Sequence, residues 1–360
     1  MLYSTRARLT ALLLGSVALP LPATAASLTQ LQPLVGGGQS HVTALSGDGQ
    51  VSVGVSTNMN GENGAIVWGL GAAAQDQGAW IINGTVAGIG TAVSNNGLHL
   101  LAIDAFDIGR VDRSGFGYVL MGDDGTTSHT FSANGISDDG NIVVGRQDLH
   151  ATYWTWNGAG YDNAQWMASL ASGSSVAYGL TPNGALAVGS SQDAGAVTRA
   201  VVWSGASFSS VQSLDPGTYE TSTAYAISDD GSTVVGYVTD GGVDKAAMWN
   251  GTGYATTTVV APAGASSSQF KAVSADGSIA GGTYETEPFV THTYAFLYSN
   301  GQAGNLNTLL TDAGVDLSGI QLTTVTGLSD DGHFIATNDG TQNQAYIAFY
   351  DGIIGGLTTG

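Results

Sequence analysis

"AISDDGSTVVG", residues Ala226–Gly236, is the stretch that decides the fold of this chain. Asp230 and Gly231 form an Asx-Gly pair, which tolerates the positive φ of a tight hairpin turn. Ser228 supplies a hydroxyl that can bond nearby backbone amides, and the β-branched residues that follow favour a strand. The stretch therefore predicts a β-hairpin, with Asp229–Asp230 in the turn rather than in a catalytic pair or a calcium loop.

The same pattern occurs seven times along the 360 residues. Aligned on the glycine, successive copies lie 48, 43, 44, 47, 46 and 55 residues apart, and each has a hydroxyl residue three positions earlier. Repetition at this period indicates a repeat architecture, in which the repeated acids serve the fold. The predicted turn residues are Asp48, Gly49, Asn96, Gly97, Asp139, Gly140, Asn183, Gly184, Asp230, Gly231, Asp276, Gly277, Asp331 and Gly332.

An apolar strand that ends in a large side chain follows each hairpin, as in Ala200–Trp203 and Ala246–Trp249. One such side chain per repeat predicts packing between repeats, and a Trp-lined sugar groove is the alternative. The strands are nearly continuous apolar runs, as expected where both faces of a sheet are covered. Seven units of about four strands each predict an all-β fold, a seven-bladed β-propeller of four-stranded blades, with a β-solenoid as the main rival.

Three segments lie outside the repeated pattern. Residues Asn305–Gly319 have the apolar spacing of a short helical turn. The ring could be closed by Leu28–Leu34 or by the C-terminal stretch Gly352–Thr359, and the sequence leaves both possibilities open.

Residues 1–25 have the features of a cleaved secretory signal peptide. Arg6 and Arg8 precede the apolar run Leu9–Leu19, which is too short to span a bilayer, and Ala23–Ala25 provides the small residues of a cleavage site. Cleavage after Ala25 leaves residues 26–360 as a single seven-repeat propeller domain. No later run is long enough for a transmembrane segment, so we expect an exported chain, extracellular or at the cell surface, with the periplasm as an alternative.

Composition excludes several classes of function. The formal charge of −20 becomes −22 without Arg6 and Arg8, so neither nucleic acid nor an anionic membrane is an expected partner. The absence of cysteine excludes thiol nucleophiles, zinc–thiolate sites and disulfides. The six histidines are scattered, and no Gly-x-Ser-x-Gly elbow occurs, so we assign neither a metal site nor a catalytic residue.

The repeat resembles a known family. The pattern Ala-x-Ile-Ser-x-Asp-Gly, then Val-Val-Gly, then Ala-x-x-Trp is similar to the HAF repeats of bacterial extracellular proteins, over roughly residues 42–350. The ending "VDLSGIQLTTVTGLSDDGHFIA", followed by "AYIAFY", resembles the close of HAF-repeat passenger regions in autotransporters. The resemblance implies an exported propeller, and it implies no reaction and no catalytic residue.

One recurrence is not required by the turns. An acid appears seven to nine residues after the hairpin glycine in six repeats, where the second and third strands of a blade would join. We expect these acids to share one face, able to bind a cation, weakly Ca²⁺, or a carbohydrate or protein ligand outside the cell; solvated loop charge is the alternative. This acidic loop set is Asp104, Asp148, Asp193, Asp240, Glu285 and Asp339.

The sequence thus predicts a monomeric, non-enzymatic, exported propeller that needs no cofactor and binds an extracellular ligand. The alternative is a secreted polysaccharide hydrolase or lyase that assembles carboxylates from different blades near the axis. Propellers host both kinds of function, so the position of the acids relative to the axis is the observation that separates the two.

Overall fold

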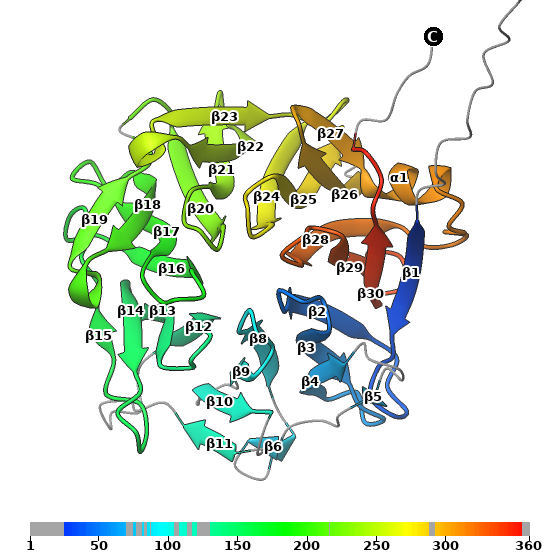
Figure 1. Cartoon of the computed structure of the whole chain (residues 1–360), viewed down its shortest axis with the longest axis horizontal. Helices are drawn as coiled ribbons and strands as arrows, with labels where there is room; N and C mark the ends of the chain where they lie inside the picture. Colours follow the sequence, from blue (N-terminus) through cyan, green and yellow to red (C-terminus); the bar gives the residue numbers. More distant parts are fainter. Residues whose placement is uncertain are drawn as a thin grey trace, which may run out of the picture.

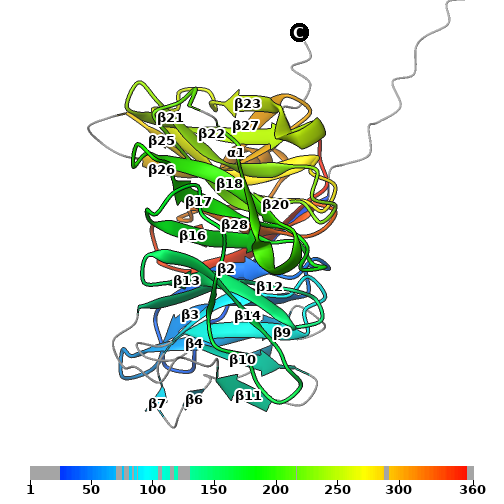
Figure 2. The same ribbon diagram turned by 90° about the vertical axis from the view of Figure 1, so that its left-hand side faces the viewer.

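The computed structural model describes residues 25–69, 75–76, 81–82, 85–86, 88–103, 108–113, 117–120, 130–215, 217–287 and 292–354. Seven four-stranded antiparallel sheets surround a central axis, so the chain is a seven-bladed β-propeller, as predicted (Figure 1). Figure 2 shows the ring from the side, with the strands of neighbouring blades stacked along it. In each of blades 1 to 6, the strands follow chain order from the axis outward.

Blades 1 to 3 come from the first half of the chain. Blade 1 contains β2 (Ser40–Leu45), β3 (Val51–Thr57), β4 (Asn63–Gly69) and β5 (Gln75–Asp76). Blade 2 contains β8 (Ile89–Val93), β9 (His99–Ile103), β10 (Ile108–Asp112) and β11 (Gly117–Leu120), and a separate hairpin precedes it, β6 (Ile81–Ile82) with β7 (Thr85–Val86). Blade 3 contains β12 (Phe131–Ile136), β13 (Ile142–Gln147), β14 (His150–Thr155) and β15 (Gln165–Trp166).

Blades 4 to 7 complete the ring. Blade 4 contains β16 (Ser175–Leu180), β17 (Ala187–Gln192), β18 (Thr198–Ser204) and β19 (Ser210–Ser213). Blade 5 contains β20 (Thr221–Ile227), β21 (Val234–Asp240), β22 (Val243–Asn250) and β23 (Thr256–Val260). Blade 6 contains β24 (Ser267–Val273), β25 (Ile279–Thr286), β26 (His292–Ser299) and β27 (Gln302–Asn305). Blade 7 contains β28 (Leu322–Leu328), β29 (Phe334–Asp339), β30 (Ala345–Tyr350) and, outermost, β1 (Ala26–Leu31).

The N-terminal segment closes the ring, which settles the choice that the sequence left open. Strand β1 pairs antiparallel with β30, from Ala26 opposite Tyr350 to Leu31 opposite Ala345. Blade 7 is therefore made from both ends of the described chain, which lie side by side in Figure 1. Since β1 begins at Ala26, cleavage after Ala25 would leave the closing strand intact.

The tryptophans at the strand ends pack between blades and do not line a sugar groove. Trp203 and Trp249 are 0% exposed. Trp249 of blade 5 lies in one apolar cluster with Val188 and Val202 of blade 4, and Trp203 of blade 4 packs with residues of blade 3. Packing of this kind fills the space between neighbouring sheets with close-packed apolar side chains.

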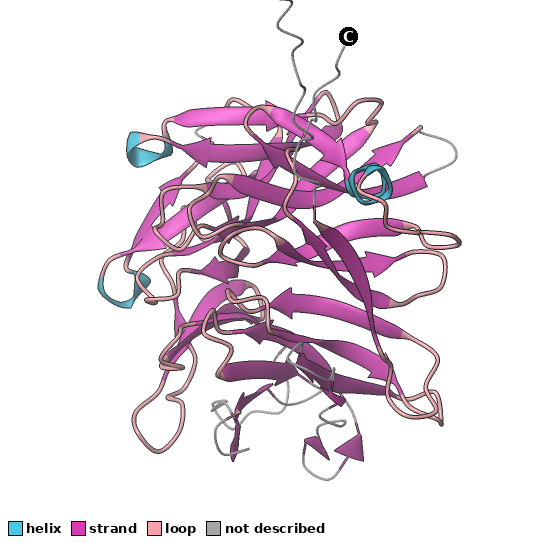
Figure 3. Ribbon diagram, turned by 45° about the vertical axis from the view of Figure 1, so that its right-hand side comes forward, coloured by secondary structure: helices cyan, strands magenta, loops and turns pink. Residues whose placement is uncertain are grey.

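Helical structure in the described chain is short and lies at the outer parts of the ring (Figure 3). The expected helical turn is α1 (Leu306–Asp312), which buries Leu306 and Leu310; the Asn305 side chain caps it by accepting from the amides of residues 307 and 308. Two 3₁₀ turns, η1 (Ala206–Phe208) and η2 (Thr252–Tyr254), precede the outermost strands of blades 4 and 5. None of the helices described is long and apolar enough to cross a membrane.

Candidate functional site

Every hairpin between the first and second strand of a blade uses the same hydrogen bonds. In blade 5 the Ser228 hydroxyl donates to Asp230 Oδ1 at 2.6 Å and accepts from the Thr233 amide at 3.0 Å. Asp230 Oδ1 also accepts from the Ser232 amide at 2.8 Å, and Gly231 has a φ of 72°. These bonds, led by the one from Ser228, stabilise the ionised carboxylate and lower the pKa of Asp230.

The other six hairpins repeat this geometry, so the residues predicted at turns all lie in turns. In each of them a Ser or Thr hydroxyl donates to the Asx side chain two positions later. The amide five positions after that hydroxyl residue donates back to the hydroxyl oxygen. The repeated Asx and Ser/Thr side chains are therefore committed to the fold.

The residue between the hydroxyl and the Asx lies in the turn, but its side chain takes no part in the turn's hydrogen bonds and belongs to what we call the axial ring. Backbone bonds link this ring from blade to blade: the amides of Gly47, Asp229 and Asp330 donate to the carbonyls of Asn95, Ala275 and Gly47 at 2.7, 3.0 and 2.7 Å. These bonds join hairpins of different blades at one end of the axis. The axial ring consists of Gly47, Asn95, Asp138, Pro182, Asp229, Ala275 and Asp330.

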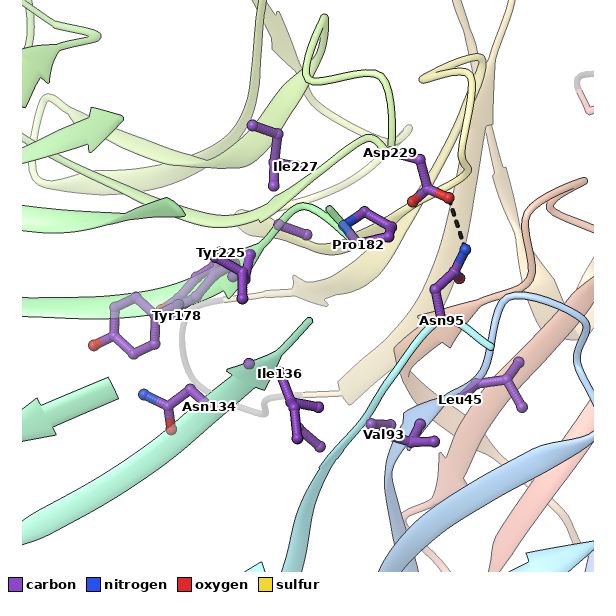
Figure 4. Close-up of a pocket in the computed structure, with 16 residues that line it drawn as sticks. Leu45, Val93, Asn95, Asn134, Ile136, Tyr178, Pro182, Tyr225, Ile227 and Asp229 are labelled. Carbon is purple, nitrogen blue, oxygen red and sulfur yellow. Dashed lines mark hydrogen bonds between the residues drawn. The ribbon is translucent and has the colours of Figure 1, made fainter. Parts of the chain in front are cut away.

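Side chains of the axial ring meet across the axis. Asn95 Nδ2 of blade 2 donates to Asp229 Oδ2 of blade 5 at 2.8 Å, although the two residues are 134 positions apart (Figure 4). A Cβ atom at Gly47 would lie 2.0 Å from Asn95 Oδ1 and 2.2 Å from Asp330 Oδ1. Because Gly47 has no side chain, the amide of Asn95 and the carboxylate of Asp330 can come together beside it.

The environment of the axial ring disfavours ionised carboxylates. Burial, followed by the nearby charges of Asp330 and Asp138, raises the pKa of Asp229 to about 6, while the bond from Asn95 opposes that rise. The pKa of Asp330 is also raised, first by burial and then by Asp138 among other acids, against the bond from Asn95. Neighbouring acids of one hairpin, Asp229 and Asp230, thus have pKa shifts of opposite sign.

The glycine of the Val-Val-Gly motif lies opposite a β-bulge in the innermost strand. In blade 5 the register shifts between Ala224 and Ala226, and Ala224 pairs with Gly236. A Cβ atom at Gly236 would lie 2.0 Å from the carbonyl oxygen of Thr223, so a glycine lets the two strands approach this closely. The residue left out of the ladder is Tyr225, which lines the axial cavity.

The same bulge occurs in all seven blades and forms a second ring of variable side chains. In blade 6 the bulged residue is Lys271, whose ammonium lies 3.7 Å from the ring centroid of Tyr225 and donates to Gln269 Oε1 at 2.7 Å. Burial lowers the pKa of Lys271 to about 8. This bulge ring consists of Thr43, Thr91, Asn134, Tyr178, Tyr225, Lys271 and Thr326.

An axial cavity of about 200 Å³ lies between the two rings. Asn95 and Asp229 line it at the hairpin end, and Asn134 and Tyr178 belong to the bulge ring, as Figure 4 shows. Tyr178 packs edge-on against Tyr225, with ring centroids 5.2 Å apart. Aliphatic residues of the innermost strands form the wall between, including Leu45, Val93, Ile136, Leu180 and Ile227. The cavity thus combines an apolar wall with polar groups at both ends, which is the general character of a small-molecule site.

The acidic loop set lies elsewhere, at the joins of second and third strands, where its described members bond to their own blade or its connections. Asp193 pairs with Arg199 at 3.0 Å, and the exposed Asp240 pairs with Lys245 at 2.7 Å. Asp339 is 1% exposed and accepts from three backbone amides, and Glu285 accepts from the Ser267 hydroxyl. Asp148 lies in the β13–β14 turn with a φ of 52°, and Asp104 lies outside the described residues.

No three His, Asp or Glu side chains in the described chain are arranged so that they could hold a metal ion. A ligand role for the acidic loop set stays a prediction. Asp193 and Asp240 pair with the side chains of Arg199 and Lys245, and Asp339 accepts from backbone amides. Each of these three acids therefore has a structural role in its own loop.

Sequence reasoning missed the axial ring and the bulge ring. Asp229 and Asp230 both lie in the predicted turn, but only the side chain of Asp230 bonds within it, and the side chain of Asp229 extends to the axis. The signal that could have found the axial ring is variation inside the repeat: the position before the Asx holds Gly, Asn, Asp, Pro or Ala, while its neighbours hardly change.

Comparisons with known proteins support the fold alone. No family model matches the chain, and no curated protein matches its sequence. The structure is similar to that of U3-55K, with a TM-score of 0.55 and 12% identity over 89% of this chain and 98% of that one. A putative TolB from Agrobacterium tumefaciens has a TM-score of 0.49 and 14% identity over 72% and 89% of the two chains. TolB from Acinetobacter baumannii has a TM-score of 0.44 and 9% identity over 84% and 80%.

Proposed function

We propose that this β-propeller is an exported, non-enzymatic binding protein of the cell surface or the medium, and that the axial cavity holds its ligand. The observation that carries the proposal is the contrast between invariant turns and variable rings. The side chains of the hairpin turns recur in every blade, whereas the axial-ring and bulge-ring positions hold different residues in different blades, and Asn134, Tyr178 and Asp229 line one cavity.

The size and lining of the cavity define the class of ligand. About 200 Å³ holds a molecule about as large as six or seven water molecules, which corresponds to one sugar ring or one amino acid. Asn95 and Asp229 offer hydrogen bonds at one end, and Tyr178 offers a ring face at the other. The ligand is therefore a single small polar molecule rather than a polymer.

Export is supported by the basic and apolar character of residues 1–25 and by the resemblance of the repeats to HAF repeats. Expression of the full chain in a bacterium, followed by mass measurement of the exported product, tests this part. A product that begins at Ala26 would support it, and retention of the uncleaved chain in the cytoplasm would contradict it.

The binding proposal is tested by thermal melting of the protein with a panel of monosaccharides and amino acids. A ligand of the cavity raises Tm for the wild type, and it raises Tm less for Tyr178→Leu, which removes the ring face, and for Asp229→Asn. The matched control is Asp276→Asn, which removes a turn carboxylate of blade 6 and no cavity group. Equal shifts in all four proteins, or no shift with any compound, would contradict the proposal.

One observation favours the alternative, a polysaccharide hydrolase or lyase. Asp229 has a pKa raised to about 6 and lies near the charges of Asp330 and Asp138, as a general acid beside carboxylates would. Release of reducing ends from a polysaccharide panel tests this function. Activity in the wild type that falls at least about a hundredfold in Asp229→Asn and persists in Asp276→Asn would establish the enzyme in place of the binding protein.

A further inference from the structure

Among the tryptophans that the structure describes, Trp166 departs from the packing role of the others. Trp68, Trp154, Trp203 and Trp249 are between 0% and 1% exposed, whereas Trp166 is 65% exposed. Trp166 lies in β15, the two-residue outermost strand of blade 3, at the rim of the ring in Figure 1. It is not part of the repeated strand-end pattern, so the demands of the propeller fold do not account for an indole at this position.

Trp166 is held in place although it is exposed. The imidazole of His150 stacks on its ring, with centroids 4.1 Å apart and planes inclined by 28°. Strand pairing places Trp166 opposite Thr152, and the next amide, that of Met167, donates to the carbonyl of Ala151 at 2.9 Å. The backbone and one side of the ring are therefore fixed, so the indole itself would lose little rotamer freedom when a molecule stacks on it.

We propose that Trp166 and His150 form a platform on the outer edge of blade 3 that binds a neutral polysaccharide. The axial C–H groups of a β-linked pyranose form an apolar, slightly positive face, and the indole ring presents a negative π surface of similar width. The imidazole nitrogens of His150 lie at the same place and can bond the equatorial hydroxyls of the sugar.

The negative charge of the chain and the small exposed apolar area around Trp166 favour a neutral sugar over an anionic polysaccharide or a protein as the ligand. The chain has 28 acidic and 8 basic residues, so it repels anionic polysaccharides. Leu149, which precedes His150 in the chain, is 57% exposed, but Leu149 and Trp166 together present far less area than the roughly 1,200 Å² that a specific protein interface buries. One sugar ring, in contrast, needs no more than one indole.

The proposal does not depend on the axial cavity, since blade 3 presents Trp166 at its outer edge and Asn134 and Ile136 at the axis. It is tested with cellohexaose, whose ring hydroxyls are equatorial, and with the β-1,4-linked glucuronate hexamer as its anionic counterpart. Isothermal titration calorimetry measures affinity, and tryptophan fluorescence reports the exposed indole. We expect the wild type to bind cellohexaose with a millimolar Kd and the glucuronate hexamer at least about tenfold more weakly.

Trp166→Ala should weaken cellohexaose binding at least about tenfold, while Trp166→Phe keeps a ring and should lose about threefold. His150→Ala should lie between the two, because the indole stays but its stacking partner is gone. Met59→Ala is the matched control, since Met59 is 72% exposed in blade 1 and its loss should change nothing.

Tyr178→Leu and Asp229→Asn, the cavity variants, should bind cellohexaose like the wild type, which separates this platform from the proposed axial site. Because Trp166 is exposed, Trp166→Ala should melt close to the wild-type Tm, and this is checked first. The proposal is overturned if the wild type binds no cellohexaose up to its solubility limit, or if Trp166→Ala binds it equally well. It is also overturned if Trp166→Ala converts a dimer to a monomer in light scattering, because the indole would then serve a protein contact.

Discussion

Asp229 and Asp230 are neighbours in one hairpin, yet they belong to two different regions of the molecule. Asp230 is bonded to the hydroxyl and amides of its own turn, and its pKa is lowered. Asp229 reaches Asn95 of another blade across the axis, and its pKa is raised to about 6. The difference teaches that the repeated residues of this protein build the propeller, while the residues that vary within the repeat build its interior surface.

The largest loss of stability is expected at Gly236, the repeated glycine that lies opposite the bulge. Gly236→Ala places a methyl group 2.0 Å from a backbone oxygen of Thr223, so the strands must separate. Blade 2 has Ala102 at the matching position, so the fold survives and the cost should be about 2–3 kcal/mol in the free energy of unfolding by urea. Gly69→Ala, where no atom lies within 4 Å, is the control. A loss below 0.5 kcal/mol would mean that glycine is not required at the bulge.

The next largest loss of stability is expected in the hairpin turn, at Ser228 and Asp230. Ser228→Ala removes the acceptor of the buried Thr233 amide together with the donor to Asp230. An amide left without a partner costs about 1–2 kcal/mol, measured as the fall in unfolding free energy. Asp230→Ala should cost about 1 kcal/mol, because the amide it leaves is exposed. If both variants were as stable as the wild type, the repeated hairpin chemistry would not be what stabilises the inner ends of the blades.

Substitution of Asp229, at the axis, should change stability in the opposite direction and raise the free energy of unfolding at pH 7. The folded pKa of Asp229, about 6, exceeds its ordinary value of 3.8, so its ionisation opposes folding at pH 7. That penalty disappears as pH falls from about 6 to below 4. Asp229→Asn should therefore raise stability at pH 7 by about 1 kcal/mol, after allowance for solvent screening, and change little at pH 4.

Urea unfolding of both proteins across this pH range provides the measurement, and Asp230→Asn is its control. The control should lose stability at pH 7, because the turn carboxylate has a lowered pKa and its ionised form supports the fold. Destabilisation of Asp229→Asn at pH 7 would show that its carboxylate is needed in the ionised state.

The smallest effect is expected at the acidic loop set. Asp240 forms an exposed pair with Lys245, and such pairs contribute little because water screens them. Asp240→Asn should change unfolding free energy by less than about 0.5 kcal/mol. Melting with calcium, against sodium chloride of matched ionic strength, tests the predicted weak cation binding. A calcium-specific rise in Tm that Asp240→Asn abolishes would show that the acidic loop set binds Ca²⁺ in addition to its local contacts.

The sequence by itself determined the blade count, the turns and the strand-end tryptophans, because each depends on contacts within a repeat or between successive repeats. These local contacts recur about every 45 residues, so the sequence pattern behind them occurs seven times and can be recognised without the structure. The helical turn at Leu306–Asp312 was predictable for the same reason, since Asn305 caps it within three residues.

Only the tertiary structure decided which terminus closes the ring and which residues meet at the axis. Strand β1 pairs with β30, at the other end of the chain, and Asn95 bonds Asp229 over a separation of 134 residues. Neither pairing has a local signature, because the propeller brings these residues together only after its blades have closed in a circle. The axial cavity and the raised pKa of Asp229 both arise from that closure, through burial and the approach of carboxylates from different blades.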